Sequence, residues 1–139
     1  AVSDRDPQRA KALAELAGAE FHSGDNFEVI ERPEVDAVFV STPEGEHSAP
    51  VRRALELGKP VLCEKPIDLD IKRVETCWKE IGGLKPTVMI GFNRRFDPSF
   101  ASLKARLDTG EIGDVELVTI LSRDPAPPPM STVRCGRTG

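Results

Sequence analysis

Short apolar runs alternate with helix-forming stretches along most of this sequence, and that alternation restricts the fold more than any other feature. The clearest run, residues 35–40, is Val-Asp-Ala-Val-Phe-Val and predicts a strand buried on both faces. The connections are short, and crossover helices of roughly 10 to 15 residues imply that the strands pair in parallel. We therefore predict an α/β fold in which a parallel sheet carries helices on both faces.

Local signals predict where the elements begin and end. Asp6 can cap a helix, Pro7 suits its first turn and Gly18 suits its end, so residues 8–17 are expected to be helical. Four further helices are expected, and they end at Ile30, Leu57, about Ile81 and Leu107. Asp25 or Asn26 would cap the first, the second would begin at residue 46, Asp68 or Asp70 would cap the third, and Asp97-Pro98 would begin the fourth. The expected strands are residues 1–3, 20–22, 35–40, 60–63, 87–90 and 115–121.

Composition limits the classes of partner. The chain has a net charge of −4 and a pI of about 5.3, which argues against nucleic acid or an anionic membrane. No stretch approaches the roughly 18 apolar residues of a membrane span, and no signal peptide is visible, so we expect a cytoplasmic protein. Cys63, Cys77 and Cys135 are an odd number at wide spacing, which indicates reduced thiols. With only His22 and His47, we expect no metal site.

The segment Cys63-Glu64-Lys65-Pro66 is the strongest chemical signal. It places two opposite charges and a proline directly after a predicted buried strand, which is costly without a purpose. A desolvated lysine there can have a lowered pKa, hydrogen-bond a substrate hydroxyl and help move its proton. Glu64 would hold Lys65 by charge, and Pro66 would fix the turn. The alternative is a structural ion pair at the strand end.

Asp4 and Arg5 follow the first predicted strand, just before a helix. In nucleotide-binding α/β folds, an acidic residue here accepts hydrogen bonds from the two ribose hydroxyls of the adenosine half. Asp4 would also repel a 2′-phosphate, which favours NAD. Arg5 can hold a phosphate, which leaves NADP possible, and Asp4 could instead be a helix cap or a solvated loop residue.

Two further strand ends carry polar residues. Ser41, Thr42 and Pro43 follow the most hydrophobic strand, where doubly wound sheets bind ligands. His47 begins the next helix and could touch a cofactor or simply cap and pack. Arg94 follows the strand at 87–90 and could bind a polyol hydroxyl, or it could be a solvated arginine near a helix start.

These segments together resemble the Gfo/Idh/MocA oxidoreductase family, most closely its inositol 2-dehydrogenase branch. The resemblance covers about residues 1–129 and implies a Rossmann-like sheet. The matching segments are Val2-Ser3-Asp4, 35–38, Ser41-Thr42-Pro43 with His47, 58–61, Cys63-Glu64-Lys65-Pro66, 91–97, Ile112-Gly113 and 122–129.

The resemblance implies NAD-dependent oxidation (NADP possible) of a secondary hydroxyl on a cyclic polyol, such as myo-inositol, or a sugar, giving a ketone. By resemblance Lys65 is the catalytic residue, and it contacts the substrate together with Arg94. The cofactor-side residues implied are Asp4, Arg5, Ser41, Thr42, Pro43, His47, Glu64 and Lys65. The expected partners are a small-molecule substrate and further copies of the chain in a homo-oligomer.

The sequence departs from the family in two ways. The family opens with a strand and a glycine-rich turn, but this chain begins at the second strand. Because the missing strand is central in the sheet, its neighbours would stand nearly 10 Å apart, at about 4.8 Å per strand spacing. We expect a partner strand, a rearranged sheet or residues 115–121 to fill the gap. Residues 130–139 match nothing in the family, whose second domain supplies a catalytic Asp and His.

The expected domains follow from this comparison. Residues 1–113 would form a partial dinucleotide-binding domain that lacks its usual first strand. Residues 114–129 would begin the substrate-binding C-terminal domain and supply its first strand, and 130–139 would be a disordered tail. We therefore predict a truncated dehydrogenase, with the activity of the isolated chain left open. The alternative is a non-catalytic remnant that self-associates or binds a partner through exposed sheet edges.

Overall fold

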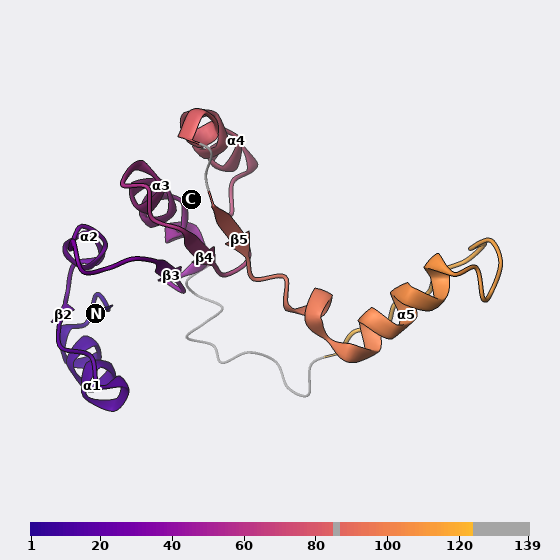
Figure 1. Ribbon diagram of the computed structural model, residues 1–139, viewed down its shortest axis with the longest axis horizontal. Coiled ribbons are helices and arrows are strands. Elements are labelled where there is room, and N and C mark those ends of the chain that lie inside the picture. Colours follow the sequence, from indigo (N-terminus) through magenta and orange to yellow (C-terminus); the bar gives the residue numbers. More distant parts are fainter. Residues whose placement is uncertain (85–86, 124–139) are drawn as a thin grey trace. The chain divides into compact units, whose positions relative to one another are not determined.

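The computed structural model describes residues 1–84 and 87–123, which belong to two compact units, Ala1–Asp97 and the residues from Pro98 onward. In the first unit, strands and helices alternate as the sequence predicts (Figure 1). Its elements are β1 (Val2–Ser3), α1 (Pro7–Ala17), β2 (His22–Ser23), α2 (Asn26–Ile30), β3 (Val38–Val40), η1 (Glu44–Glu46), α3 (Ser48–Glu56), β4 (Val61–Cys63), α4 (Ile71–Ile81), η2 (Gly82–Leu84), β5 (Val88–Ile90) and η3 (Asn93–Phe96). The Rossmann-like α/β fold with parallel strands is confirmed.

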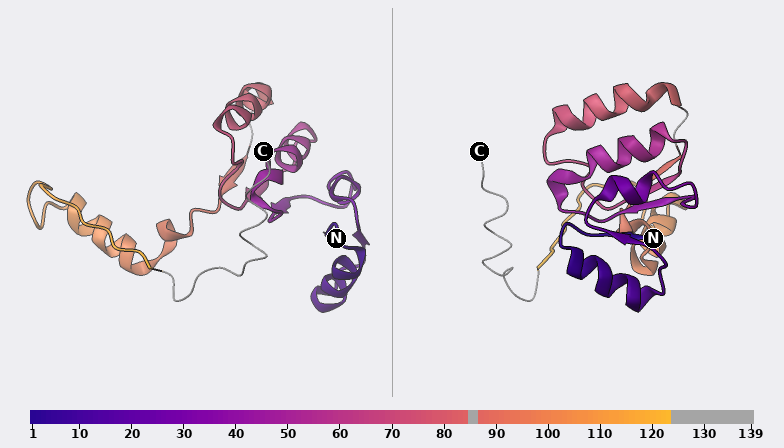
Figure 2. Two further views of the ribbon diagram at one scale, coloured as in Figure 1. Left: turned by 180° about the vertical axis from the view of Figure 1, so that it is seen from behind. Right: turned by 90° about the vertical axis from the view of Figure 1, so that its left-hand side faces the viewer.

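The strands of the first unit form two separate parallel sheets. One sheet is β1-β2, and the other is β3-β4-β5. In the larger sheet the last row joins Val40, Cys63 and Ile90, so the residues that follow these three share one edge. The helices lie on both sides of the strand layer, with α2, α3 and α4 on one side and α1 on the other (Figure 2).

The gap between β1 and β3 stays open in the described chain, which contradicts our expectation that it must be filled. The strand order is not rearranged, and residues 115–121 form no strand that could pair with β1 or β3. The helix layer provides a physical reason, because α2 packs against α3 across the break. Neighbouring helices stand about 8–10 Å apart, close to two strand spacings, so drawing β1 onto β3 would disrupt that packing. That a strand from a partner chain fills the gap remains a prediction.

Capping residues define the helices of the first unit. The Asp6 side chain accepts hydrogen bonds from the first turn of α1, and Gly18 ends that helix with a φ of 65°. Asp25 caps α2 in the same way. Of the two candidates for α4, Asp70 is the cap, since its carboxylate accepts from Lys72 N. The helix predicted from residue 46 begins at Ser48 instead, after the short turn η1.

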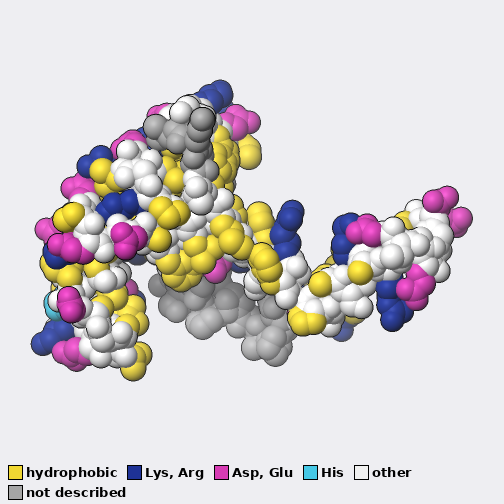
Figure 3. Space-filling model, viewed as in Figure 1, with side chains coloured by type: hydrophobic (Ala, Val, Ile, Leu, Met, Phe, Trp, Pro, Cys, Tyr) yellow, Lys and Arg dark blue, Asp and Glu magenta, His cyan; other side chains and the backbone are white. Residues whose placement is uncertain are grey.

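The core lies between α3, α4 and one face of the larger sheet. It contains Ile30, Val40, Val51, Ala54, Leu55, Val61, Cys63, Cys77 and Ile81. The opposite face carries Phe39, Leu62 and Met89, which lie in one row across the three strands. They are 62%, 40% and 48% exposed, and Figure 3 shows apolar side chains gathered there. The prediction of strands buried on both faces is therefore wrong for the described chain, since α3 and α4 cover only one.

The second unit begins with α5 (Pro98–Asp108), as the Asp97-Pro98 signal predicts. The predicted strand at 115–121 is wrong, because residues 114–123 form no regular structure. A strand needs a hydrogen-bonded neighbour, and Leu117 and Ile120 are instead 85% and 81% exposed. The boundary between the two compact units falls after Asp97 and not after residue 113, although the domain prediction itself stays untested. The proline-rich segment and tail at 124–139 lie outside the described residues.

Candidate functional site

A large cavity occupies the gap between β1 and β3 and extends to the carboxyl ends of both strands. Its volume is about 1020 Å³. All five residues predicted to hold cofactor at these two strand ends line it, namely Asp4, Arg5, Ser41, Thr42 and Pro43. Apolar side chains that include Leu13, Val29 and Ile30 form other parts of the wall. The structure therefore brings together residues about forty positions apart in one space.

Asp4 and Arg5 form the β1 side of the cavity mouth. Asp4 is half-buried, and its Oδ1 accepts a hydrogen bond from Asp6 N at 2.8 Å. Arg5 donates from Nη1 to Glu46 Oε1 at 2.7 Å, so an ion pair joins the end of β1 to the loop after β3. Glu46 is not predictable from the sequence, because nothing in its spacing shows that it would face Arg5.

His47 is inside the protein, with 1% of its surface exposed. Its Nε2 lies 2.6 Å from the carbonyl oxygen of Thr42, and its Nδ1 lies 2.5 Å from that of Pro66. The ring therefore joins the loop after β3 to the loop after β4. Both polar atoms are engaged within the chain, and the predicted contact with cofactor stays a prediction.

Glu64 follows β4 in the same row as Ser41. Its backbone N–H donates to Val40 O at 2.9 Å, and its carboxylate accepts from Lys65 N at 3.3 Å. The carboxylate also lies against Gly91, where an added Cβ would be 3.2 Å from Cδ and both carboxylate oxygens. Gly91 thus provides the space that Glu64 occupies, a contact that its position at a strand end did not predict.

Lys65 is exposed, so the prediction of a desolvated lysine is wrong for the described chain. No ion pair joins it to Glu64 among residues 1–84 and 87–123, which also corrects the expected pairing. The peptide bond between Lys65 and Pro66 is cis.

Asp68 is a buried carboxylate behind this loop. It accepts from Ser48 Oγ at 2.8 Å and from Asp70 N at 3.1 Å, and Arg73 Nη1 lies 3.9 Å away. Burial raises the pKa of Asp68, but the hydrogen bonds and the Arg73 charge outweigh burial and leave the pKa below its usual value. Asp68 therefore joins the end of the Lys65 loop to the start of α3.

Two other groups near the strand ends differ in character. Burial, with the nearby Glu64 charge, raises the pKa of the Cys63 thiol to about 11, so this thiol is protonated and inert. Arg94 is exposed in η3, after β5, and is therefore at the same edge of the sheet as Glu64 and Lys65. Among the described residues, no cluster of three or more His, Cys, Asp or Glu could hold a metal ion.

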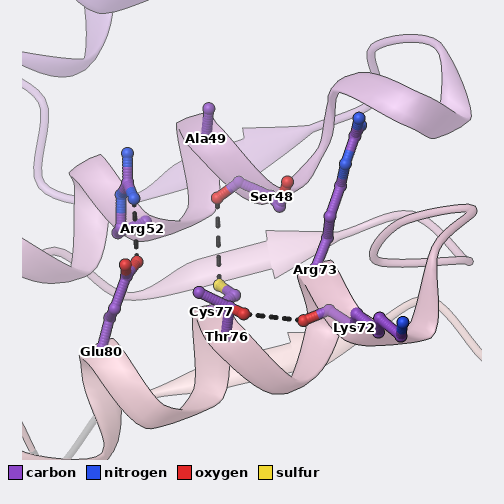
Figure 4. Close-up of a pocket in the computed structure, with 8 residues that line it drawn as sticks. All are labelled: Ser48, Ala49, Arg52, Lys72, Arg73, Thr76, Cys77 and Glu80. Atoms are coloured by element: carbon purple, nitrogen blue, oxygen red, sulfur yellow. Dashed lines mark hydrogen bonds and ion pairs between the residues drawn. The ribbon is translucent and has the colours of Figure 1, made fainter.

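A smaller pocket of about 260 Å³ lies between α3 and α4 (Figure 4). Arg52 and Glu80 bridge it with a 2.8 Å ion pair, and the Cys77 thiol points across to the Ser48 carbonyl oxygen. None of the residues predicted to bind cofactor or substrate lines this pocket. It is a groove in the helix layer and not part of the strand-end site.

Comparisons with known proteins match this architecture. The model of the oxidoreductase family with NAD-binding Rossmann fold matches residues 1–92. The chain is 43% identical over 134 residues to inositol 2-dehydrogenase of Rhizobium meliloti (strain 1021), covering 96% of this chain and 40% of that protein. It is 39% identical over 134 residues to myo-inositol 2-dehydrogenase of Thermotoga maritima, with the same coverage. The chain thus spans about 40% of the length of these relatives.

Solved structures agree. The crystal structure of a probable dehydrogenase from Thermotoga maritima superposes with a TM-score of 0.88 at 39% identity, covering 95% of this chain and 40% of that one. Scyllo-inositol dehydrogenase from Lactobacillus casei with bound NAD(H) and scyllo-inositol gives a TM-score of 0.76 at 34% identity, covering 81% and 33%. In the described part of the chain, no helix has the length and apolar character needed to cross a membrane.

Proposed function

The chain belongs to the Gfo/Idh/MocA oxidoreductase family, which has the NAD-binding Rossmann fold, and on that basis we propose that it functions as an NAD-dependent polyol dehydrogenase. The proposed reaction oxidises a secondary hydroxyl of a cyclic polyol such as myo-inositol, or of a sugar, to a ketone. The relatives named as inositol dehydrogenases support the substrate class. We also propose a cytoplasmic enzyme that acts on small molecules as a homo-oligomer.

We place the cofactor in the part of the cavity at the carboxyl ends of β1 and β3. Asp4 would accept hydrogen bonds from the ribose hydroxyls with its carboxylate, and Ser41, Thr42 and Pro43 would form the floor on the β3 side. When bound, NAD⁺ supplies the acceptor for the hydride that leaves the substrate carbon. The observation that carries the proposal is that the predicted cofactor residues after β1 and after β3 line one cavity.

The ion pair between Arg5 and Glu46 supports a preference for NAD over NADP. A free arginine beside the ribose could bind a 2′-phosphate. Here Glu46 engages Arg5 at 2.7 Å, so a 2′-phosphate would have to displace Glu46 to bind Arg5. Glu46 therefore acts in the same direction as Asp4, whose carboxylate would repel that phosphate.

Lys65 would act on the substrate. It leaves the carboxyl end of β4, one strand along from the cavity, and its side chain is accessible. We assign it the hydrogen bond to the reacting hydroxyl and a part in moving that proton. Glu64 would face the cofactor side from its position against Gly91, and Arg94, after β5, would hydrogen-bond another substrate hydroxyl.

Calorimetric titration tests the cofactor assignment. NAD⁺ is titrated into the wild-type chain and into Asp4→Asn, which removes the carboxylate proposed to hold the ribose. Asp6→Asn is the matched control, because it removes a charge two residues away and keeps a good helix cap. We expect Asp4→Asn to weaken binding about tenfold or more, in line with about 1.5–3 kcal/mol for hydrogen bonds to a charged group, and Asp6→Asn to have little effect. Equal affinities for both variants would refute the role of Asp4.

Absorbance of the reduced cofactor tests the catalytic assignment. Myo-inositol is added to the NAD⁺ complex, and turnover is compared between the wild-type chain and Lys65→Ala. We expect the substitution to abolish any turnover while leaving NAD⁺ affinity within a few fold. Turnover that survives in Lys65→Ala would remove the proposed role of this lysine.

Unpaired strand edges support a second candidate function, association without catalysis. The facing edges of β1 and β3 have no partner strand among the described residues, and such edges readily pair with another chain. The backbones of Val38 and Val40 hydrogen-bond to the β4 side, so the N–H of Phe39, which lies between them, faces the gap. Phe39→Pro should therefore block pairing at this edge, whereas Phe39→Ala should not. Sedimentation equilibrium showing self-association unaffected by Phe39→Pro would exclude this edge as the interface.

A further inference from the structure

The ring of His47 makes a pair of contacts that the proposed reaction does not use. The imidazole is buried, and each ring nitrogen lies within hydrogen-bond distance of a backbone carbonyl oxygen, at 2.5 Å for Pro66 and 2.6 Å for Thr42. A carbonyl oxygen can only accept a hydrogen bond. Both nitrogens must therefore donate for both contacts to be bonds.

A neutral imidazole cannot satisfy this arrangement, because it has one N–H and one bare nitrogen. We propose that His47 is held as the doubly protonated, positively charged ring, and that this cation ties the Thr42 loop to the Pro66 loop and so positions Lys65. The protonation follows from the two carbonyl contacts alone. The positioning of Lys65 for catalysis rests on the proposed function.

The surroundings of the ring contain opposing effects. Burial disfavours a charged ring, and so does its position at the start of α3, where the helix dipole is positive. Two short charge-assisted hydrogen bonds favour it. The charged groups on neighbouring segments are Glu44, Glu46 (paired with Arg5), Glu64, Lys65 and Asp68, which accepts from Ser48 next to His47 and has Arg73 nearby.

The tie fixes the chain on both sides of the proposed site. The Thr42 carbonyl belongs to the segment that lines the cavity, and the Pro66 carbonyl follows Lys65 by one residue. If the ring lost one proton, a bare nitrogen would face a carbonyl oxygen, and two lone pairs would repel at about 2.5 Å. One of the two loops would then move away, and the backbone that carries Lys65 would lose its fixed position.

Nitrogen NMR of the histidine rings tests the protonation in the wild-type chain. The sequence has only two histidines, and His22 is exposed, so it serves as the internal reference. The His22→Gln variant assigns the signals. At about pH 7.5 we expect both His47 nitrogens to give protonated signals, because each faces a carbonyl oxygen. A bare-nitrogen signal from His47 would overturn the proposal.

A matched pair of variants, His47→Gln and His22→Gln, tests the positioning. Glutamine has one amide group and cannot donate in the two directions that the ring spans. We expect His47→Gln to shift the Lys65 amide signal and to speed hydrogen exchange about tenfold or more at Glu46, whose N–H donates to Pro43 O at 2.8 Å in the Thr42 loop, with α1 unchanged. His22→Gln should change neither, and an unmoved Lys65 amide in His47→Gln would overturn the positioning role.

The wild-type chain answers the same question if His47→Gln unfolds. Raising the pH until His47 loses a proton should move the Lys65 amide with the same midpoint, and an amide that stays in place overturns the role. Neither measurement uses cofactor or substrate. Failure of this inference is therefore distinguishable from failure of the proposed dehydrogenase activity.

Discussion

Gly91→Ala should disturb the strand-end site through a single contact. The backbone of Gly91 is outside the left-handed region, so alanine is allowed there on conformational grounds. The new Cβ would be 3.2 Å from Cδ and both carboxylate oxygens of Glu64, inside the ordinary contact range that begins near 3.4 Å. The carboxylate must therefore move by a few tenths of an ångström, away from its bond with Lys65 N.

The expected cost follows from these contacts. Overpacking costs about 1–3 kcal/mol, and the lower end applies because Glu64 is flexible and half-buried. Weakening the Lys65 N–H bond adds up to about 1 kcal/mol, and reduced freedom of the unfolded chain returns about 0.4–1 kcal/mol. Gly83→Ala is the matched control, since no atom of the described residues lies within 4 Å of its added Cβ. Gly91→Ala should thus be about 1–2 kcal/mol less stable than Gly83→Ala.

Urea denaturation measures this difference. With a slope of about 2 kcal/mol per molar, the midpoints of the two variants should differ by roughly 0.5–1 M. Glu64→Ala removes the side chain that Cβ would strike, so the Gly91→Ala penalty should largely vanish in that background. A penalty that persists unchanged in the Glu64→Ala background, or no penalty at all, would refute the contact.

Three further predictions use the same unfolding and labelling measurements. Asp70→Ala removes the cap of α4 and should cost about 1 kcal/mol in urea denaturation, whereas Asp70→Asn should cost little. Because folding lowers the pKa of Asp68 from 3.8, its stabilisation of the fold is present above that value and is lost as the pH falls through the native pKa. The free energy of unfolding should therefore fall less steeply with decreasing pH in Asp68→Asn than in the wild-type chain. Identical slopes for the two proteins would contradict this. Cys63 has a pKa of about 11, and burial is the main cause that raises the pKa of Cys77. With Cys135 replaced by Ser, both thiols should therefore resist a disulfide reagent at about pH 8 until urea is added. Rapid labelling of the native chain would contradict their burial.

Local chemistry allowed the helices to be predicted from the sequence. Asp6, Pro7 and Gly18 act on residues within one turn of themselves, so the limits of α1 follow from their identities. Strand limits were less predictable. The apolar run at 35–40 extends beyond β3, because pairing with β4 begins only at Val38. The run at 115–121 has the alternation of a strand, but a strand also needs a neighbour, which no local pattern specifies.

The site was predictable in composition and less so in geometry. The position of Asp4 and of Ser41–Pro43 after strands was enough to place them at one edge, and they line one cavity. The contact of Arg5 with Glu46 depends on how two sheets face each other, which spacing cannot reveal. The exposure of Lys65 likewise depends on what covers the strand end, and not on the residue types beside it.

Mapping NAD⁺ binding by backbone-amide NMR tests the central claim most directly. The claim is that the cavity at the ends of β1 and β3 receives the cofactor. On addition of saturating NAD⁺ to the wild-type chain, the largest shifts should fall on Asp4, Arg5, Ser41 and Thr42. Shifts that instead cluster between α3 and α4, or signals that do not move at all, would contradict the account.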